Sequence, residues 1–390
     1  MRSLYIIFSI LFINILTSCA VSAISTGEQN IPIIAWGGIP ADKADTLYSL
    51  AKECGFNTHL GLYSKQDNAL IAMDAAARAG MRIIINFPQV IDSSESAVAA
   101  VKDHPALLAY HIKDEPLADD YPMIAEVCER VCSLDSLHPC YINLLPNWSW
   151  GVDEYSAHIE DFALKFDLPF YSFDNYPVVE DEGLVSVRPD WYRNLEEFSS
   201  MARRHGKPFW AFALAKSHGI VQPEVAFYPE PTLGHLRLQV FSNLLYGAQA
   251  IQYFNFTGIV DPSTCQKKAA FDLVRQVNSE VRAYSSVFAG CSVLGVWHIG
   301  ESIPDGTARL ESMPHETVES LSVSGEGSVV AMIENGGETY LAVQNRSCKE
   351  QAALDISFSR PVSLITVDGP VRFQNHPLIL EPGNVSIFKL

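Results

Sequence analysis

Two short segments of the sequence place carboxylates where they could catalyse a reaction. One reads Asp114-Glu115-Pro116 and the other Asp174-Asn175-Tyr176-Pro177, and each follows a run of apolar residues. A carboxylic acid that is still protonated near neutral pH can act as a general acid, and a second carboxylate can act as a base or a nucleophile beside it. Because a neighbouring negative charge raises the pKa of a carboxyl group, we expect Asp114 to favour the protonated form of Glu115. We therefore expect Glu115 and Asp174 to be catalytic.

The elements that must position these carboxylates alternate eight times between residues 32 and 288. Short apolar runs predict strands at Ile33 to Gly37, Thr58 to Leu62, Arg82 to Phe87, Leu107 to Ile112, Cys140 to Leu145, Leu168 to Phe173, Phe209 to Ala213 and Ala250 to Phe254. Stretches of helical period predict helices at Ala41 to Cys54, Asp67 to Ala79, Ser94 to Lys102, Tyr121 to Leu134, Asp153 to Lys165, Pro189 to His205, Pro231 to Tyr246 and Lys267 to Val287.

Eight such repeats predict an α/β fold, a closed (β/α)8 TIM barrel over residues 32–289, because about 250 residues is the usual size of this fold. An open, doubly wound sheet is the alternative. It is less favoured because the segment Trp36-Gly37-Gly38-Ile39-Pro40, after the first strand, lacks the glycine-rich phosphate-binding pattern.

Residues 290–390 have a different pattern, without helical periodicity. Short runs typical of strands predict a small all-β sandwich, and Asn335-Gly336-Gly337 predicts a hairpin turn. The expected strands are Val329 to Glu334, Tyr340 to Gln344, Ala353 to Phe358, Val362 to Val367 and Val385 to Leu390.

The first residues have the layout of an export signal, with Arg2 followed by an apolar run from Leu4 to Leu16. Leu16-Thr17-Ser18-Cys19 resembles the lipobox of bacterial lipoproteins, which implies a signal peptide at 1–18, lipidation of Cys19 and a tether at 19–31. The alternative is an ordinary signal peptide cut near Ala23. The first interpretation predicts a cell-envelope protein, periplasmic or at the outer membrane or cell surface, held to the membrane by its lipid.

Composition and charge limit the partners. Asp and Glu number 45 against 27 Lys and Arg, for a formal net charge of −18, and no basic cluster is present to neutralise a row of phosphates. Nucleic-acid binding is therefore not expected. The cysteines show no regular spacing, and Cys128 and Cys132, one helical turn apart, are expected to be buried thiols rather than metal ligands.

In a TIM barrel the functional side chains gather at the carboxyl ends of the strands, where aromatic rings can pack on sugars and polar groups can bind hydroxyls. Trp150 and His218 are further candidates of this kind, beside the main set. The expected substrate-binding residues are Trp36, Asn86, His111, Asp114, Asn143, Trp148, Asn175, Tyr176, Lys216, Tyr253 and Asn255.

The segments Gly55-Phe56-Asn57-Thr58, Ala109 to Pro116 and Asp174 to Pro177 together resemble the clan A glycoside hydrolases, barrel enzymes that include many β-galactosidases and mannanases. That family commonly has Asn-Glu-Pro at the end of its fourth strand, and here Asp114 replaces the Asn. The resemblance implies a glycosidase that cleaves O-glycosidic bonds of an oligosaccharide or polysaccharide, with Glu115 as acid/base and no cofactor.

The seventh expected strand departs from the family, which carries its nucleophilic Glu there. The segment from Pro208 to Ser217 contains no carboxylate. Asp174 could serve instead as the base of an inverting reaction, or Glu224 or Glu230 could fold back over the site. Alternatively, the chain is a catalytically degenerate, glycan-binding lipoprotein.

A metal-dependent barrel enzyme is a further alternative from a different class. Its ligands would be His59, His111, Glu115 and Asp174, although their spacing matches no typical metal motif.

Overall fold

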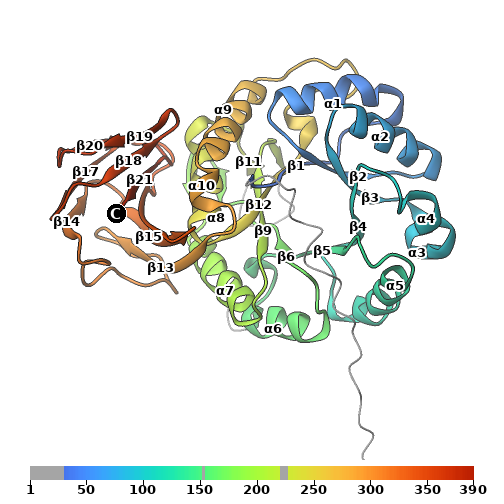
Figure 1. The fold of residues 1–390 in the computed structure, drawn as a ribbon, viewed down its shortest axis with the longest axis horizontal. Helices are drawn as coiled ribbons and strands as arrows, with labels where there is room; N and C mark the ends of the chain where they lie inside the picture. The colour runs from blue at the N-terminus through green and yellow to red at the C-terminus, as the bar shows by residue number, and fades with distance from the viewer. Residues whose placement is uncertain (1–29, 152–153, 220–226) are drawn as a thin grey trace, which may run out of the picture.

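A computed structural model of the chain describes residues 30–151, 154–219 and 227–390 and confirms the barrel. Eight parallel strands close on themselves in the order β1-β12-β9-β6-β5-β4-β3-β2 (Figure 1). Their bounds are β1 Ile33–Trp36, β2 Thr58–Leu62, β3 Arg82–Asn86, β4 Leu107–Asp114, β5 Cys140–Leu144, β6 Tyr171–Phe173, β9 Phe209–Leu214 and β12 Ala248–Phe254. The sequence predicted all eight, with ends that differ by a few residues.

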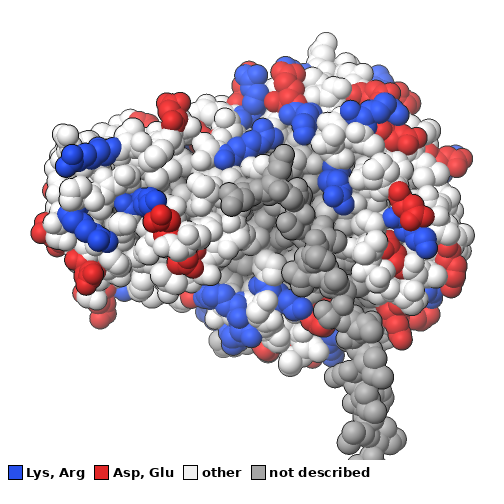
Figure 2. All heavy atoms as spheres, in the orientation of Figure 1, with Lys and Arg blue, Asp and Glu red and all other residues white. Residues whose placement is uncertain are grey.

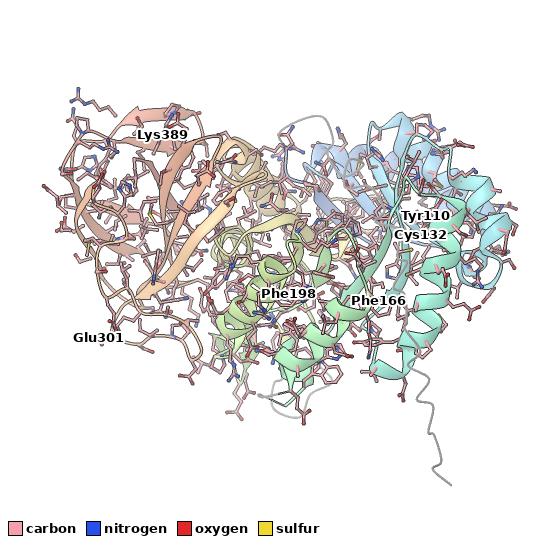
Figure 3. All side chains as sticks on the ribbon, turned by 60° about the horizontal axis from the view of Figure 1, so that its bottom comes forward. Tyr110, Cys132, Phe166, Phe198, Glu301 and Lys389 are labelled. Atoms are coloured by element: carbon pink, nitrogen blue, oxygen red, sulfur yellow. The ribbon has the colours of Figure 1, made fainter. Side chains whose placement is uncertain are left out.

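The helices form a ring outside the strands, as Figure 1 shows. Their bounds are α1 Ala44–Glu53, α2 Gln66–Arg78, α3 Pro88–Asp92, α4 Ser94–Val101, α5 Tyr121–Leu134, α6 Tyr155–Lys165, α7 Trp191–Arg204, α8 Leu233–Leu245, α9 Ala270–Ala283 and α10 Ser285–Phe288. Each presents an apolar stripe to the strands. On α7, for example, Phe198 packs on Phe173 of β6 with ring centroids 4.3 Å apart (Figure 3).

Two apolar layers result from the alternation of side chains along each strand. Inside the barrel, Phe170 stacks on Trp210 at 3.8 Å, next to Tyr141. In the outer layer, Tyr110 of β4 lies against α5 and donates a hydrogen bond of 2.8 Å to Asp135 (Figure 3). A residue's position along its strand therefore decides whether its side chain points to the lumen or to the helices.

The C-terminal region forms the expected β-sandwich. A six-stranded sheet has the order β13-β15-β16-β21-β18-β19, and a three-stranded sheet has the order β14-β17-β20. The predicted hairpin joins β15 and β16 through Gly336 and Gly337, both with positive φ (60° and 81°), as a tight two-residue turn requires. The strand bounds are β13 Ser292–Ile299, β14 Val318–Val323, β15 Ser328–Asn335, β16 Glu338–Asn345, β17 Ala352–Phe358, β18 Ser363–Thr366, β19 Gly369–Arg372, β20 Leu378–Leu380 and β21 Val385–Lys389.

The six-stranded sheet packs on α8, beside α9 and α10 (Figure 1). Gln344, on β16, is fully buried at this junction. Its amide nitrogen donates to the carbonyl oxygens of Leu238 and Gly383, both at 3.0 Å, and its amide oxygen accepts from Ser242 at 2.7 Å. The junction is thus a packed, hydrogen-bonded interface rather than a flexible linker.

A separate, small four-stranded sheet lies at the carboxyl ends of the barrel strands and was not expected from the sequence. It has the order β10-β11-β7-β8, where β7 is Val178–Asp181, β8 Leu184–Val187, β10 His218–Gly219 and β11 Phe227–Tyr228. The turn Glu182-Gly183 between two short alternating runs was the available signal. This sheet brings the segment after β6 next to the segment after β9.

The surface of the described residues carries mixed charge. In the face shown by Figure 2, acidic and basic side chains are interspersed, without a continuous basic stripe. Within the described ranges, no helix is long and apolar enough to cross a membrane. Cys19 and the predicted signal peptide lie outside the described residues.

Candidate active site

Neighbouring strands β4, β5 and β6 bring the two carboxylate segments to one edge of the barrel. In the strand register, Asp114 pairs with Asn143, and Asn143 pairs with Ser172. Glu115 directly follows β4, and its backbone N–H donates to the carbonyl oxygen of Asn143 at 2.9 Å. Asp174 directly follows β6. The carboxyl ends of parallel strands meet at one edge, so the motifs converge there.

The backbone at Glu115 is left-handed, with φ of 48°. A non-glycine residue rarely adopts this conformation, and such strain concentrates at functional sites because it aims a side chain. Here it turns Glu115 away from the strand direction that Lys113 and Asp114 follow.

The carboxyl groups of Glu115 and Asp174 lie within hydrogen-bonding reach of each other. Asp174 is buried, and this burial, followed by the negative charges of Glu115 and Asp114, raises its pKa well above the usual range. Glu115 keeps contact with solvent but is partly surrounded by protein; this desolvation, followed by the charge of Asp114, raises its pKa also. Since two carboxylates in contact do not both ionise readily, the pair retains one proton more easily than separated groups would.

Asn143 bridges the carboxyl groups. Its Nδ2 donates to Oδ1 of Asp174 at 2.9 Å and to Oδ1 of Asp114 at 3.2 Å. These hydrogen bonds lower the pKa of each Asp, in opposition to burial, because they stabilise the ionised forms. Tyr176 also donates a hydrogen bond to Asp174. Asn143 therefore lies at the end of β5 beside the carboxyl groups, but its amide nitrogen is hydrogen-bonded to Asp174 and Asp114.

His111 lies inside the barrel below the carboxyl groups and stacks on Tyr141, with ring centroids 5.6 Å apart. Its side chain is buried, and burial lowers its pKa to about 4, so the ring is neutral at pH 7. Neither ring nitrogen has a hydrogen-bond partner among the described residues. Asn86, at the end of β3, donates from Nδ2 to the backbone oxygen of His111 at 2.7 Å. The Asn86 amide therefore has a structural partner on the neighbouring strand.

Aromatic rings line the side of the mouth formed by β1, β12 and the small sheet. Trp36 packs on Phe254 at 5.0 Å between centroids. Tyr176 contacts Phe254 at 5.6 Å and Tyr228 at 5.7 Å. His218 lies 4.8 Å from the Tyr228 ring. The wall includes Trp36 and Tyr176, which the sequence predicted as substrate-binding residues, and aromatic rings of this kind suit the C–H face of a sugar ring.

Trp148 and Arg188 meet near this wall. The guanidinium group of Arg188 lies over the Trp148 ring, 4.9 Å from its centroid, and also donates to the hydroxyl group of Tyr228. Lys216, two residues after β9, is half-buried. Arg188 was not expected at the site, because it lies in the segment that follows the unforeseen hairpin.

Tyr253 and Asn175 are not brought to the site. Tyr253 points to the helix layer, where its ring meets Phe56 edge-on at 5.5 Å, because the inward position on β12 belongs to Phe254. Asn175 is buried, and its Nδ2 donates to Oδ1 of Asn194 on α7 at 2.7 Å. Tyr253 packs on the segment between α1 and β2, and Asn175 holds α7 to the barrel.

Asn255 and Trp150 also have structural partners. The side-chain oxygen of Asn255 accepts from the backbone N–H of Thr257 at 3.0 Å and caps a short 3-10 helix. Trp150 stacks on His158 of α6 at 3.8 Å and faces the helix layer rather than the mouth. The position of Asn255 after a strand and of Trp150 in a loop did not suffice to predict where their side chains point.

Among the described residues, neither a carboxylate at the end of β9 nor the proposed metal set is assembled. β9 ends at Leu214 without a carboxylate, Glu230 is exposed, and Glu224 lies outside the described residues. His59 is held between the hydroxyl of Tyr48 (2.7 Å) and the backbone oxygen of Gly37 (3.2 Å). In the described part of the chain, no group of three or more His, Cys, Asp or Glu is placed to hold a metal ion.

Three lumen residues were not anticipated as part of the site: Tyr141, Ser172 and Gln252. Ser172 donates a hydrogen bond to Asn143, and Tyr141 and Gln252 bond in turn to Ser172. The available signal was a polar residue at an inward position of three apolar barrel strands, β5, β6 and β12.

Comparisons with known proteins agree with the fold. No protein-family model and no curated protein sequence matches the chain. A glycoside hydrolase family 5 structure from Bacteroides vulgatus ATCC 8482 is similar with a TM-score of 0.55 and 11% identity, over 92% of this chain and 88% of that one. The catalytic domain of a β-amylase from Paenibacillus polymyxa has a TM-score of 0.44 and 8% identity, over 64% of this chain and 97% of that one. At these identities the first likeness shows a shared fold, and the chemistry must be argued from the site.

Proposed function

We propose that this protein is a glycoside hydrolase that cleaves O-glycosidic bonds of an oligosaccharide or polysaccharide, with Glu115 and Asp174 as its carboxyl pair. One observation carries the proposal: two carboxyl groups from non-adjacent strands are in contact at the mouth of the barrel, next to an aromatic wall. Acid–base cleavage of a glycoside requires two carboxyl groups of different protonation. The shared fold with a glycoside hydrolase is consistent with this proposal.

In the proposed reaction Glu115, which faces solvent, protonates the leaving oxygen. Asp174 is buried and has the more strongly raised pKa, so it retains the shared proton at rest and passes it to Glu115 across their hydrogen bond. Asn143 and Tyr176 then stabilise the Asp174 carboxylate through the hydrogen bonds that they donate. After the leaving group departs, Glu115 is the base that accepts a proton from the attacking water.

A glycan-binding protein without hydrolytic activity is the second candidate. Two carboxyl groups within hydrogen-bonding reach leave no room between them for the attacking water of an inverting enzyme, whose carboxyl groups stand roughly 6.5–9.5 Å apart. Inverting hydrolysis therefore requires Glu115, on its exposed side, to move away from Asp174 when sugar binds. A binder would need no such movement.

One experiment separates the two candidates. Purified protein is incubated with a broad oligosaccharide panel, and both reducing-sugar release and ligand-induced stabilisation are measured for wild type and Glu115→Gln. An enzyme releases sugar in the wild type and not in the variant, whereas a binder is stabilised by the glycan without release in either. If no glycan in the panel is cleaved and none stabilises the protein, the enzyme proposal and the binder proposal are both overturned.

We further propose that the chain is exported and lipid-anchored at Cys19 in the cell envelope, with the carbohydrate as substrate outside the cytoplasm. The support is the sequence of residues 1–19, in which an apolar run precedes Leu-Thr-Ser-Cys. Cys19→Ser should move the protein from the membrane fraction to the soluble fraction or leave an uncleaved leader. Unchanged membrane association of a fully processed variant would contradict the anchor.

A further inference from the structure

A chain of hydrogen bonds runs through the barrel lumen and ends at the carboxyl pair. The hydroxyl of Tyr141 donates to Oε1 of Gln252 at 2.8 Å, and Nε2 of Gln252 donates to Oγ of Ser172 at 2.8 Å. Ser172 donates in turn to Oδ1 of Asn143 at 2.8 Å. The four side chains come from β5, β6 and β12, and all are buried.

The direction of donation is fixed at both ends of this chain. A phenol hydroxyl at one end has one hydrogen to give. At the other end, the proton that Asp174 retains lies in its hydrogen bond with Glu115, so the Oδ1 atoms of Asp174 and Asp114 that face Asn143 both accept. Asn143 must therefore present its NH₂ group to Asp174 and its oxygen to Ser172. Ser172 has a single hydroxyl hydrogen, and since this goes to Asn143, its oxygen is left to accept from Gln252. The hydroxyl of Tyr141 also lies 3.1 Å from Oγ of Ser172. With the Asn143 amide turned over, its oxygen would face the Oδ1 atoms of Asp174 and Asp114 with no hydrogen between them.

We propose that Ser172, Gln252 and Tyr141 are positioning residues that lock the amide of Asn143 with its two N–H donors toward Asp174 and Asp114. This inference rests on the proposed function, because it assigns these residues to the tuning of the same carboxyl pair. None of the three touches the reacting atoms. They act through Asn143, whose donated hydrogen bonds stabilise the ionised carboxylates.

Other groups also face the carboxyl pair and contribute to its titration, and of these Tyr141 alone belongs to the lumen chain. The charged and titratable groups around Glu115 and Asp174 are Lys113 and Asp114 on β4, His111 on β4, Tyr141 on β5, Tyr155 on α6, Tyr176 after β6, Arg188 after β8 and Tyr228 on β11.

The test is a ¹³C NMR titration of the side-chain carboxyl carbons in the full-length protein, with signals assigned by Glu115→Gln and Asp174→Asn. In Ser172→Ala, Asn143 loses the donor that fixes its oxygen and can rotate, so the pKa assigned to Asp174 should rise by about one unit. Tyr141→Phe, at the far end, should give a smaller rise in the same direction. Ser172→Thr keeps the hydroxyl and should restore the wild-type value.

A merely structural role would lower the melting temperature without changing the titration. Unchanged carboxyl titration in both Ser172→Ala and Tyr141→Phe would overturn the inference, and Tyr141→Phe keeps the test valid if the alanine variant does not fold. The outcome is separable from the proposed function. If no glycan is cleaved, the titration still measures the positioning; if Glu115→Gln abolishes cleavage while Ser172→Ala leaves the titration unchanged, only the positioning role fails.

Discussion

Glu115 and Asp174 are in contact although they follow strands that are not neighbours in the barrel. Between β4 and β6 lies β5, and its residue Asn143 supplies both the carbonyl that binds the backbone of Glu115 and the amide that binds Asp174. A single residue, through its backbone and its side chain, thus contacts both members of the pair. The contacts of the carboxyl pair therefore depend on β5, a strand that carries no carboxylate itself.

Asp174→Asn should stabilise the protein at neutral and alkaline pH. The folded-state pKa of Asp174 is raised above its unfolded value, so the folded state binds more protons and wild type loses stability as pH rises above about 4. The variant lacks this loss, because its amide does not ionise. Melting temperatures measured from pH 4 to pH 8 should show a gap in favour of the variant that widens with pH. A gap of constant size would mean that Asp174 is not the group responsible.

Acid should destabilise the fold through its buried histidines. Burial lowers the pKa of His59, His111 and His235 to about 4 and that of His298 to about 3. Their folded pKa values lie below the unfolded value of about 6.5, so the stability they contribute is complete above that pH and is lost as pH falls toward 4.

This acid sensitivity can be assigned with His298→Gln, since Gln can still bond the hydroxyl of Tyr246 at this position. Urea unfolding at pH 7, 6, 5 and 4 should give a shallower loss of unfolding free energy in the variant than in wild type, by up to about 3 kcal/mol at pH 4. Identical curves would show that His298 is not a source of the acid sensitivity.

Gly234 should not tolerate a methyl group. A Cβ at this position of α8 would lie 2.3 Å from the carbonyl oxygen of Cys348 and 2.9 Å from Pro382. Because the obstacle is partly backbone of the β-sandwich, Gly234→Ala should lower stability by about 1–3 kcal/mol despite the better helix propensity of Ala. Gly219→Ala, where the added Cβ meets no atom of the described residues within 4 Å, is the control and should be near neutral in a thermal melt.

Gln344 should be a key residue of the junction between barrel and sandwich. Gln344→Leu leaves the hydroxyl of Ser242 and two backbone carbonyls without their buried hydrogen-bond partner. Each buried polar group left unsatisfied lowers the free energy of unfolding by about 1–3 kcal/mol. Differential scanning calorimetry should show a lower melting temperature. Gln351→Leu removes an exposed hydrogen bond to Glu381 and serves as control. An equal effect of both substitutions would contradict a special role for the buried amide.

Much of the fold was predictable from the sequence because it depends on periodicity. Eight apolar runs, each followed by a helical stretch, specify a parallel barrel, and the Gly336-Gly337 turn specifies a hairpin. The order of the C-terminal strands was not predictable, since it depends on long-range pairing such as that of β13 with β15.

The candidate site was predictable as a set of strand ends but not in its details. Which side chains point inward depends on register: Phe254 faces the mouth and Tyr253 does not. The lumen residues Ser172 and Gln252 lie inside their strands, before the last residues of β6 and β12, where a search for functional residues at strand ends does not look. Their role emerges only when the barrel closes and the inward side chains of β5, β6 and β12 meet in its lumen.

The most direct test of the carboxyl pair is the turnover of a cleaved glycan by Glu115→Gln, relative to wild type and to the exposed control Glu95→Gln. Removal of a general acid typically costs about 100-fold to 10,000-fold in rate, so Glu115→Gln should lose at least about 100-fold in kcat/KM while Glu95→Gln matches wild type. Circular dichroism should confirm that both variants are folded. Turnover by folded Glu115→Gln at the wild-type rate would contradict the account.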